Sequence, residues 1–230
     1  MFHSGVKSGR DESQTAFERL KDMKILFAVF FIGLVIRVDG QTNLISVAGT
    51  SGTNMETIVC IRHGEKPREG LGQLTCRGLN RALALPDVLL GKYGKPQFIF
   101  APNPTQKVDD KGGDYYYVRP LITIEPTAIR CGLPVNTEFG FKQINDLQDE
   151  LEKPEYWNAT VFVAWEHGFL DKFAKNLVEA DGGNFAQVPS WPENDYDTIF
   201  LIKITHLGGH ESVAFTIDHE GLNNLSDNYP

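Results

Sequence analysis

Apolar and polar positions along this chain predict strands and helices in turn. Short apolar runs, bounded by turn residues, predict strands at 57–61, 97–101, 160–165, 198–204 and 212–218. Apolar residues spaced three and four apart predict helices at about 75–91, 120–131, 141–151 and 168–180. Because strands alternate with helices, we expect an α/β domain built as a three-layer αβα sandwich around a mostly parallel central sheet.

Individual residues predict where several of these elements begin and end. Thr75 can cap the first helix, and Gly132-Leu133-Pro134 stops the second. Pro126 removes a backbone donor inside the second helix and predicts a kink or a restart there. Gly208-Gly209 predicts a turn that joins the last two strands as a hairpin or as neighbours at the sheet edge. Residues 102–114, rich in Pro, Asp and Gly, are predicted to form a loop.

The amino-terminal part of the chain has the pattern of a signal peptide. Residues 25–36 are an uncharged apolar run of 12 residues, whereas a membrane-spanning helix needs roughly 20. Lys24 precedes the run and small residues follow it, as in exported proteins. We therefore expect secretion or export to the periplasm, with no stable membrane insertion after the signal is removed. Retention of 25–36 as a membrane anchor is the alternative.

This pattern divides the chain into four segments. Residues 1–22 are polar and of mixed charge, so a non-native upstream extension before a true start at Met23 explains them most simply. The signal peptide then covers 23–40. Residues 41–55, rich in Thr, Ser, Gly and Asn, are predicted to form a flexible leader, and 56–230 the folded domain.

The folded part is acidic, with a local exception. The chain has 22 Lys and Arg against 30 Asp and Glu, and the residues after the first 40 retain 16 and 25, a net charge of −9. We expect no nucleic-acid partner, because such a charge repels nucleic acid at long range. Arg62, Lys66, Arg68 and Arg77 nevertheless lie within 16 residues of one another. A local cationic pocket in an acidic domain suits a small anionic substrate.

Two short histidine motifs each follow a predicted strand. Arg62-His63-Gly64 comes directly after the first strand, and Glu166-His167-Gly168 comes directly after the strand at 160–165. In open α/β sheets, ligands bind at the carboxyl ends of strands, so we expect both motifs to meet at one edge. Arginine can bind phosphoryl oxygens and histidine can attack phosphorus, so the pair predicts phosphoryl chemistry.

The motifs resemble, in order and spacing, those of the histidine phosphatase superfamily, the phosphoglycerate mutase-like proteins. The resemblance covers roughly residues 56–180. Its matching segments are Arg62-His63-Gly64-Glu65, the G-x-L-T-x-x-G segment Gly72–Gly78, Pro126-Thr127-Ala128 with Gly132-Leu133-Pro134-Val135, and Glu166-His167-Gly168. The resemblance implies a phosphoglycerate mutase-like fold.

The resemblance also implies a reaction. His63 would attack phosphorus and form a phosphohistidine, while Arg62, His167 and a second arginine would hold the phosphoryl oxygens. The implied activity is hydrolysis of a phosphate monoester on a small phosphorylated substrate, without metal or cofactor. A phosphomutase is less favoured, because an exported protein lacks the usual sugar-phosphate pools.

The second arginine is where the chain departs from the family pattern. Thr123 stands where many members carry that arginine, and Arg119, at the start of the same segment, is the predicted substitute. Arg130 and Arg77 are the alternatives. This displacement motivates a second reading, in which the protein is a catalytically weak relative that binds phosphorylated ligands or a partner protein.

The reaction also needs a proton donor for the leaving group. Glu138 resembles the acidic position after the family's second helix and is the predicted donor, with Glu166 and Glu65 as alternatives. Such a carboxyl is expected to have a pKa raised by partial burial. The aromatic cluster Tyr115-Tyr116-Tyr117 is interpreted as packing and is not included in the site.

Overall fold

Five strands form the central sheet of residues 54–230, the part of the chain that the computed structural model describes. In spatial order they are β2 (Phe98–Phe100), β5 (Thr160–Trp165), β1 (Asn54–Arg62), β6 (Thr198–Leu207) and β7 (His210–His219). The strands β2, β5 and β1 are parallel, β6 is antiparallel to β1, and β7 is antiparallel to β6. Four of the five strands therefore run in the same direction, and the last two form the predicted hairpin around Gly208-Gly209.

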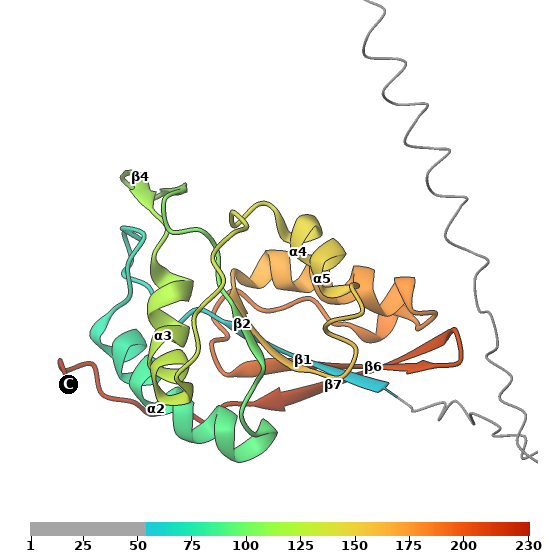
Figure 1. Cartoon of the computed structure of the whole chain (residues 1–230). Helices are drawn as coiled ribbons and strands as arrows, with labels where there is room; N and C mark the ends of the chain where they lie inside the picture. Colours follow the sequence, from blue (N-terminus) through green and yellow to red (C-terminus); the bar gives the residue numbers. More distant parts are fainter. Residues whose placement is uncertain (1–53) are drawn as a thin grey trace, which may run out of the picture. The chain divides into compact units, whose positions relative to one another are not determined.

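Helices cover both faces of this sheet (Figure 1). The helices α2 (Cys76–Tyr93) and α3 (Arg119–Cys131) pack on one face, and α4 (Ile144–Leu151) and α5 (His167–Ala180) pack on the other. A short 3₁₀ helix, η1 (Phe185–Gln187), follows α5. The predicted three-layer αβα sandwich is thus confirmed. Within the described range, no helix is long and apolar enough to cross a membrane.

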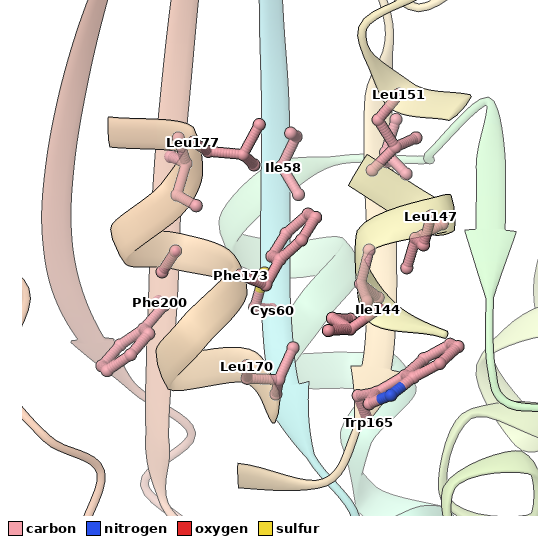
Figure 2. Close-up of a cluster of buried hydrophobic side chains, with 14 of the residues drawn as sticks. Ile58, Cys60, Ile144, Leu147, Leu151, Trp165, Leu170, Phe173, Leu177 and Phe200 are labelled. Carbon is pink, nitrogen blue, oxygen red and sulfur yellow. The ribbon is translucent and has the colours of Figure 1, made fainter. Parts of the chain in front are cut away.

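The alternation of side chains along β1 explains why both faces are covered. Ile58 and Cys60 point into the cluster under α4 and α5, whereas Val59 and Ile61 point into the cluster under α2 and α3. All four are fully buried. Figure 2 shows the first cluster, in which Phe173 of α5 lies against β1. A strand that is apolar on both faces can only be a central strand, and this places the end of β1 in the middle of the sheet.

The domain begins close to the predicted boundary. β1 starts at Asn54, two residues before the expected start at 56, so the last residues of the predicted leader already pair with β6. The predicted extension at 1–22, the signal peptide at 23–40 and the anchor at 25–36 lie outside the described residues. Export therefore stays a prediction.

Two local expectations differ from the structure. The helix α3 runs through Pro126 without a break, because Ile124 and Ala128 on either side of it are held in the same buried cluster. The segment expected to be a loop at 102–114 contains a two-stranded hairpin, β3 (Lys107–Asp110) and β4 (Gly113–Tyr116). Its strands are short, polar and mostly exposed, so they carry no apolar alternation from which strands could be predicted.

A group of carboxylates lies at the amino end of β1, away from the histidine motifs. Glu56 is 1% exposed, and both of its carboxylate oxygens lack hydrogen-bond partners among residues 54–230. Burial, together with the nearby charges of Asp181, Glu211 and Glu152, raises the pKa of Glu56 to about 8. Burial and Glu211 likewise raise the pKa of Asp181 to about 7. His206 contacts this group, with its Nδ1 2.9 Å from Glu211 Oε1.

Because the pKa values of these carboxyl groups are raised in the folded state, we expect the domain to be less stable at alkaline pH. A carboxyl whose pKa is higher in the folded state contributes its full stability below its unfolded pKa, and this contribution is lost as the pH rises through the folded pKa. The stability that Glu56 contributes should therefore be lost between about pH 5 and pH 8. Glu56→Gln should raise the Tm at pH 8 by about 5 °C and flatten the pH dependence. Thermal unfolding between pH 5 and 9 measures this, with the exposed Glu125→Gln as control; an unchanged pH profile would contradict it.

Candidate active site

The two histidine motifs lie side by side at the carboxyl edge of the sheet. Arg62, the last residue of β1, pairs in register with Trp165, the last residue of β5. The backbone N–H of His63 then donates to the carbonyl of Trp165, at 3.0 Å. Since His167 begins α5 directly after Glu166, both motifs belong to neighbouring strand ends, as the sequence predicted.

His63 is buried and its tautomer is fixed. Its Nδ1 lies 2.8 Å from the carbonyl oxygen of Gly64. A carbonyl only accepts hydrogen bonds, so Nδ1 must carry the proton and Nε2 keeps a free lone pair. Burial lowers the pKa of His63 well below its usual value, and the charges of Arg119 and Arg62 lower it further. The imidazole is therefore neutral at pH 7 and nucleophilic at Nε2.

Gly64 is held against the start of α2. A Cβ atom on Gly64 would lie 2.9 Å from the carbonyl oxygen of Gly78, and one on Gly78 would lie 2.5 Å from the carbonyl oxygen of Glu65. Only glycines allow this approach. Thr75 caps α2 as predicted, by accepting a hydrogen bond from the N–H of Gly78. The Gly72–Gly78 segment thus positions the loop that carries His63.

Arg62 is buried next to His63 and is held from one side. Its Nη1 donates to the carbonyls of Glu193 at 2.5 Å and Asp195 at 2.9 Å, in the segment before β6. The ring of Tyr196 lies under the guanidinium, 4.0 Å from it to the ring centroid. Arg62 Nε is buried and has no hydrogen-bond partner in the described part of the chain. One edge of the guanidinium is therefore anchored, and the Nε donor is unused.

Arg119 and Thr123 lie one turn apart on the same face of α3, and both face the His63 loop. Thr123 accepts a hydrogen bond from the N–H of Gly64 at 2.9 Å and donates to the carbonyl of Arg119 at 2.8 Å. Arg119 is 2% exposed, and its charge contributes to the low pKa of His63. Residues four apart share a helix face. Arg119, one turn before Thr123, therefore enters the same site as Thr123.

The two alternative arginines lie elsewhere. Arg130 forms a surface ion pair with Asp87, and Arg77 forms one with Asp227. Both side chains are more than a third exposed. Of the three candidates, Arg119 is the one that the structure buries near His63.

Asp110, from the β3–β4 hairpin, holds Arg119. Arg119 Nη1 donates to Asp110 Oδ2 at 2.6 Å, and the same oxygen accepts from the N–H of Gly72 at 2.8 Å. Burial alone would raise the pKa of Asp110, but these two hydrogen bonds lower it below its usual value. Arg119 Nε is buried and makes no hydrogen bond within residues 54–230. Like Arg62, this arginine is anchored on one side and keeps an unused donor.

His167 is oriented by the residue before it. Its Nδ1 lies 2.5 Å from Glu166 Oε1, while Glu166 Oε2 accepts from the N–H of Phe169 at 3.0 Å and caps α5. Burial would raise the pKa of Glu166, but the hydrogen bond from His167 and those from the helix backbone lower it to about 2. Glu166 is therefore ionised at neutral pH, and the positive end of the helix dipole adds to an anion site at His167.

The other two candidate acids have different surroundings. Glu65 receives two hydrogen bonds from the buried Arg81, at 2.8 and 3.0 Å, so its carboxylate ties the His63 loop to α2. Glu138 is exposed in the segment after α3, so the partial burial expected of the proton donor is not found there. Its role as the proton donor stays a prediction.

Two aromatic residues that the sequence did not assign to the site lie around His63: Tyr117, which was interpreted as packing, and Tyr196. The buried Tyr117 has its ring edge-on to His63, with a centroid distance of 6.1 Å, and Arg119 lies 4.7 Å from the centroid of that ring. Tyr196 lies 6.2 Å from His63 on another side. The position of Tyr117 two residues before Arg119 was an available signal, whereas nothing in the sequence links Tyr196 to the motifs.

No family model and no curated protein matches this sequence. Similar solved structures include a candidate phosphohistidine phosphatase, SixA, from Nakamurella multipartitia (15% identity, TM-score 0.46, 72% of this chain and 96% of that chain). A mycobacterial glucosyl-3-phosphoglycerate phosphatase bound to inorganic phosphate shares 16% identity, with a TM-score of 0.47 over 71% of this chain and 95% of that one.

A variant of the Entamoeba histolytica phosphoserine phosphatase, in complex with phosphoserine, shares 12% identity, with a TM-score of 0.44 over 73% of this chain and 98% of that one. These three proteins are members of the histidine phosphatase superfamily, whose motifs this sequence resembles. At such identities and TM-scores, the likeness assigns neither family membership nor an activity to this chain.

Proposed function

We propose that this protein is a phosphate monoester hydrolase that acts on a small phosphorylated substrate through a phosphohistidine at His63. The observation that carries the proposal is the state of that side chain. His63 is buried, its Nδ1–H is bound to the carbonyl of Gly64, and its neutral Nε2 lies in a site with two buried arginines. A neutral imidazole among buried cations is suited to attack an anionic electrophile.

The first chemical step would transfer the phosphoryl group to the protein. The Nε2 lone pair forms a bond to phosphorus as the bond between phosphorus and the ester oxygen breaks, and the leaving oxygen takes up a proton. In the second step, water attacks phosphorus and gives a proton back to the group that protonated the leaving oxygen, the bond to Nε2 breaks, and inorganic phosphate is released. His63 returns to its neutral form with Nδ1 still protonated.

Arg62, Arg119 and His167 would hold the equatorial oxygens during both steps. The unused Nε donors of Arg62 and Arg119 support this role, because a phosphoryl group offers the acceptors that they lack. Their Nη1 atoms are already bound to protein acceptors, so the guanidinium groups are oriented before substrate arrives. The same charges keep His63 unprotonated, which preserves its nucleophilicity.

The second candidate function is phosphate binding without efficient turnover. The ion pair between Asp110 and Arg119 favours it, because the carboxylate already occupies part of the arginine that should hold the substrate. Binding of inorganic phosphate, together with little hydrolysis of p-nitrophenyl phosphate, would support this function over the first.

His63→Ala should abolish turnover, because no other buried neutral imidazole lies at this edge of the sheet among the described residues. Hydrolysis of p-nitrophenyl phosphate in the presence of a chelator measures the activity. Rapid quenching should trap acid-labile phosphate on the wild type and on the control His210→Ala, but not on His63→Ala. Equal turnover by wild type and His63→Ala would rule out the mechanism.

Arg119→Met should lower kcat by about 10²–10³-fold, as the loss of a preorganised donor to a developing oxyanion does. Methionine keeps most of the buried stem and removes the charge. Arg130→Met, on the exposed face of the same helix, is the matched control and should leave kcat unchanged. If the two variants are equally active, the second phosphate-binding arginine is not Arg119.

Glu138→Gln tests the predicted proton donor through the choice of leaving group. For an alkyl phosphate such as glycerol 2-phosphate, kcat should fall by about 10²-fold, because an alkoxide leaves poorly without a proton. For p-nitrophenyl phosphate it should change little, because the phenolate leaves unprotonated. The exposed Glu155→Gln is the control. Equal effects on both substrates would remove Glu138 from the mechanism.

A further inference from the structure

The hydroxyl of Tyr117 is a buried polar group that the fold leaves without a partner. The side chain is fully buried, and its oxygen has no hydrogen bond to any of residues 54–230. Buried hydroxyls in folded proteins nearly always have a partner, since leaving one unpaired is destabilising. A phenylalanine would fill the same space without this cost, so the oxygen of Tyr117 calls for a functional explanation.

The ring of Tyr117 is held firmly in the candidate site. It lies edge-on to His63 with a centroid distance of 6.1 Å, and the ring of Phe141 packs against it at 5.1 Å. The guanidinium of Arg119 lies 4.7 Å from its centroid. The backbone N–H of Tyr117 donates to the carbonyl of Gln106 at 2.9 Å, which ties the residue to the base of the β3–β4 hairpin.

The electrostatic surroundings of the hydroxyl are those of the proposed phosphate site. Burial raises the pKa of Tyr117 above its usual value, and the charge of Glu166 adds to the increase, while the charges of Arg119 and Arg62 act in the opposite direction. The guanidinium of Arg119 comes near enough to the hydroxyl to favour its ionised form, but not with the geometry of a hydrogen bond. The same three side chains influence His63. The hydroxyl thus stays protonated at all physiological pH values, and it acts as a hydrogen-bond donor instead of transferring its proton.

We infer that the Tyr117 hydroxyl donates a hydrogen bond to an oxygen of the phosphoryl group at His63, as a further catalytic residue beside Arg62, Arg119 and His167. This inference rests on the proposed function. The oxygen of Tyr117 and the Nε donors of Arg62 and Arg119 are buried groups near His63 that lack a hydrogen-bond partner among residues 54–230. The three non-bridging oxygens of a phosphoryl group offer enough acceptors for all three donors.

Tyr196 provides an internal comparison, because it also flanks His63. Its ring lies 4.0 Å from the guanidinium of Arg62, which it supports from below, and the side chain is only half-buried. Tyr196 therefore acts on Arg62 through its ring. The contribution of Tyr117, by contrast, depends on its oxygen.

Tyr117→Phe separates the two explanations of the buried hydroxyl. If the oxygen binds phosphate, Tyr117→Phe should bind inorganic phosphate about 10-fold more weakly than the wild type, and its kcat should be about 10–100-fold lower. Its Tm without phosphate should be equal to or above that of the wild type, because an unpaired group has been removed. Tyr116→Phe is the matched control, because Tyr116 is the neighbouring residue and its side chain is exposed. Calorimetric titration with inorganic phosphate, thermal unfolding and p-nitrophenyl phosphate kinetics give the three readouts.

If the phosphate affinity and kcat of Tyr117→Phe are within about twofold of the wild-type values, the inference is overturned, since the loss of one donor to the oxyanion lowers kcat by far more. A variant that fails to fold would overturn it too, because the hydroxyl would then be stabilising the free protein. Absence of phosphate binding by the wild type would likewise overturn it. If the wild type binds phosphate but shows no turnover, the proposed hydrolase function fails, while the ratio of phosphate affinities still decides the role of Tyr117.

Discussion

The hydrogen bond between His63 Nδ1 and the carbonyl of Gly64 is the interaction on which the rest of the site depends. It fixes the proton on one ring nitrogen and leaves the other free to react. The bond forms because Gly64 fits closely against Gly78 at the start of α2, while its N–H is held by Thr123 of α3. Three elements far apart in the sequence therefore converge on the state of one imidazole.

The side chains that surround His63 are held in a similar way. Arg62, Arg119 and His167 are each held by a protein acceptor on one side: backbone carbonyls, Asp110 and Glu166 respectively. This arrangement limits the desolvation cost of the two buried guanidinium groups. It also leaves donors directed toward a ligand without further reorganisation. The domain is acidic overall, so the positive potential at this edge is local and suits a small anion better than a polymer.

The substitution of Thr123 for the expected arginine has a simple geometric consequence. In the resembled family pattern the arginine stands at this position, and here the arginine is one helical turn earlier, where i and i+4 share a face. Thr123 accepts a hydrogen bond from the backbone N–H of Gly64, a contact that an arginine could not make because its side chain has no acceptor. The displaced Arg119 reaches the hairpin of β3 and β4, which explains why Asp110 becomes its partner.

The sequence by itself determined the α/β order, the burial of β1 on both faces and the placement of His63 and His167 at strand ends. Each of these follows from local apolar periodicity and from turn residues such as Thr75 and Gly132, which act within a few residues of where they stand.

Only the tertiary structure decided which arginine enters the site, that the chain around Pro126 stays helical, and that Tyr117 is buried beside His63. These outcomes depend on contacts between segments that are distant in the sequence. The tautomer and the low pKa of His63 belong with them, because burial and neighbouring charges arise only when the chain has folded.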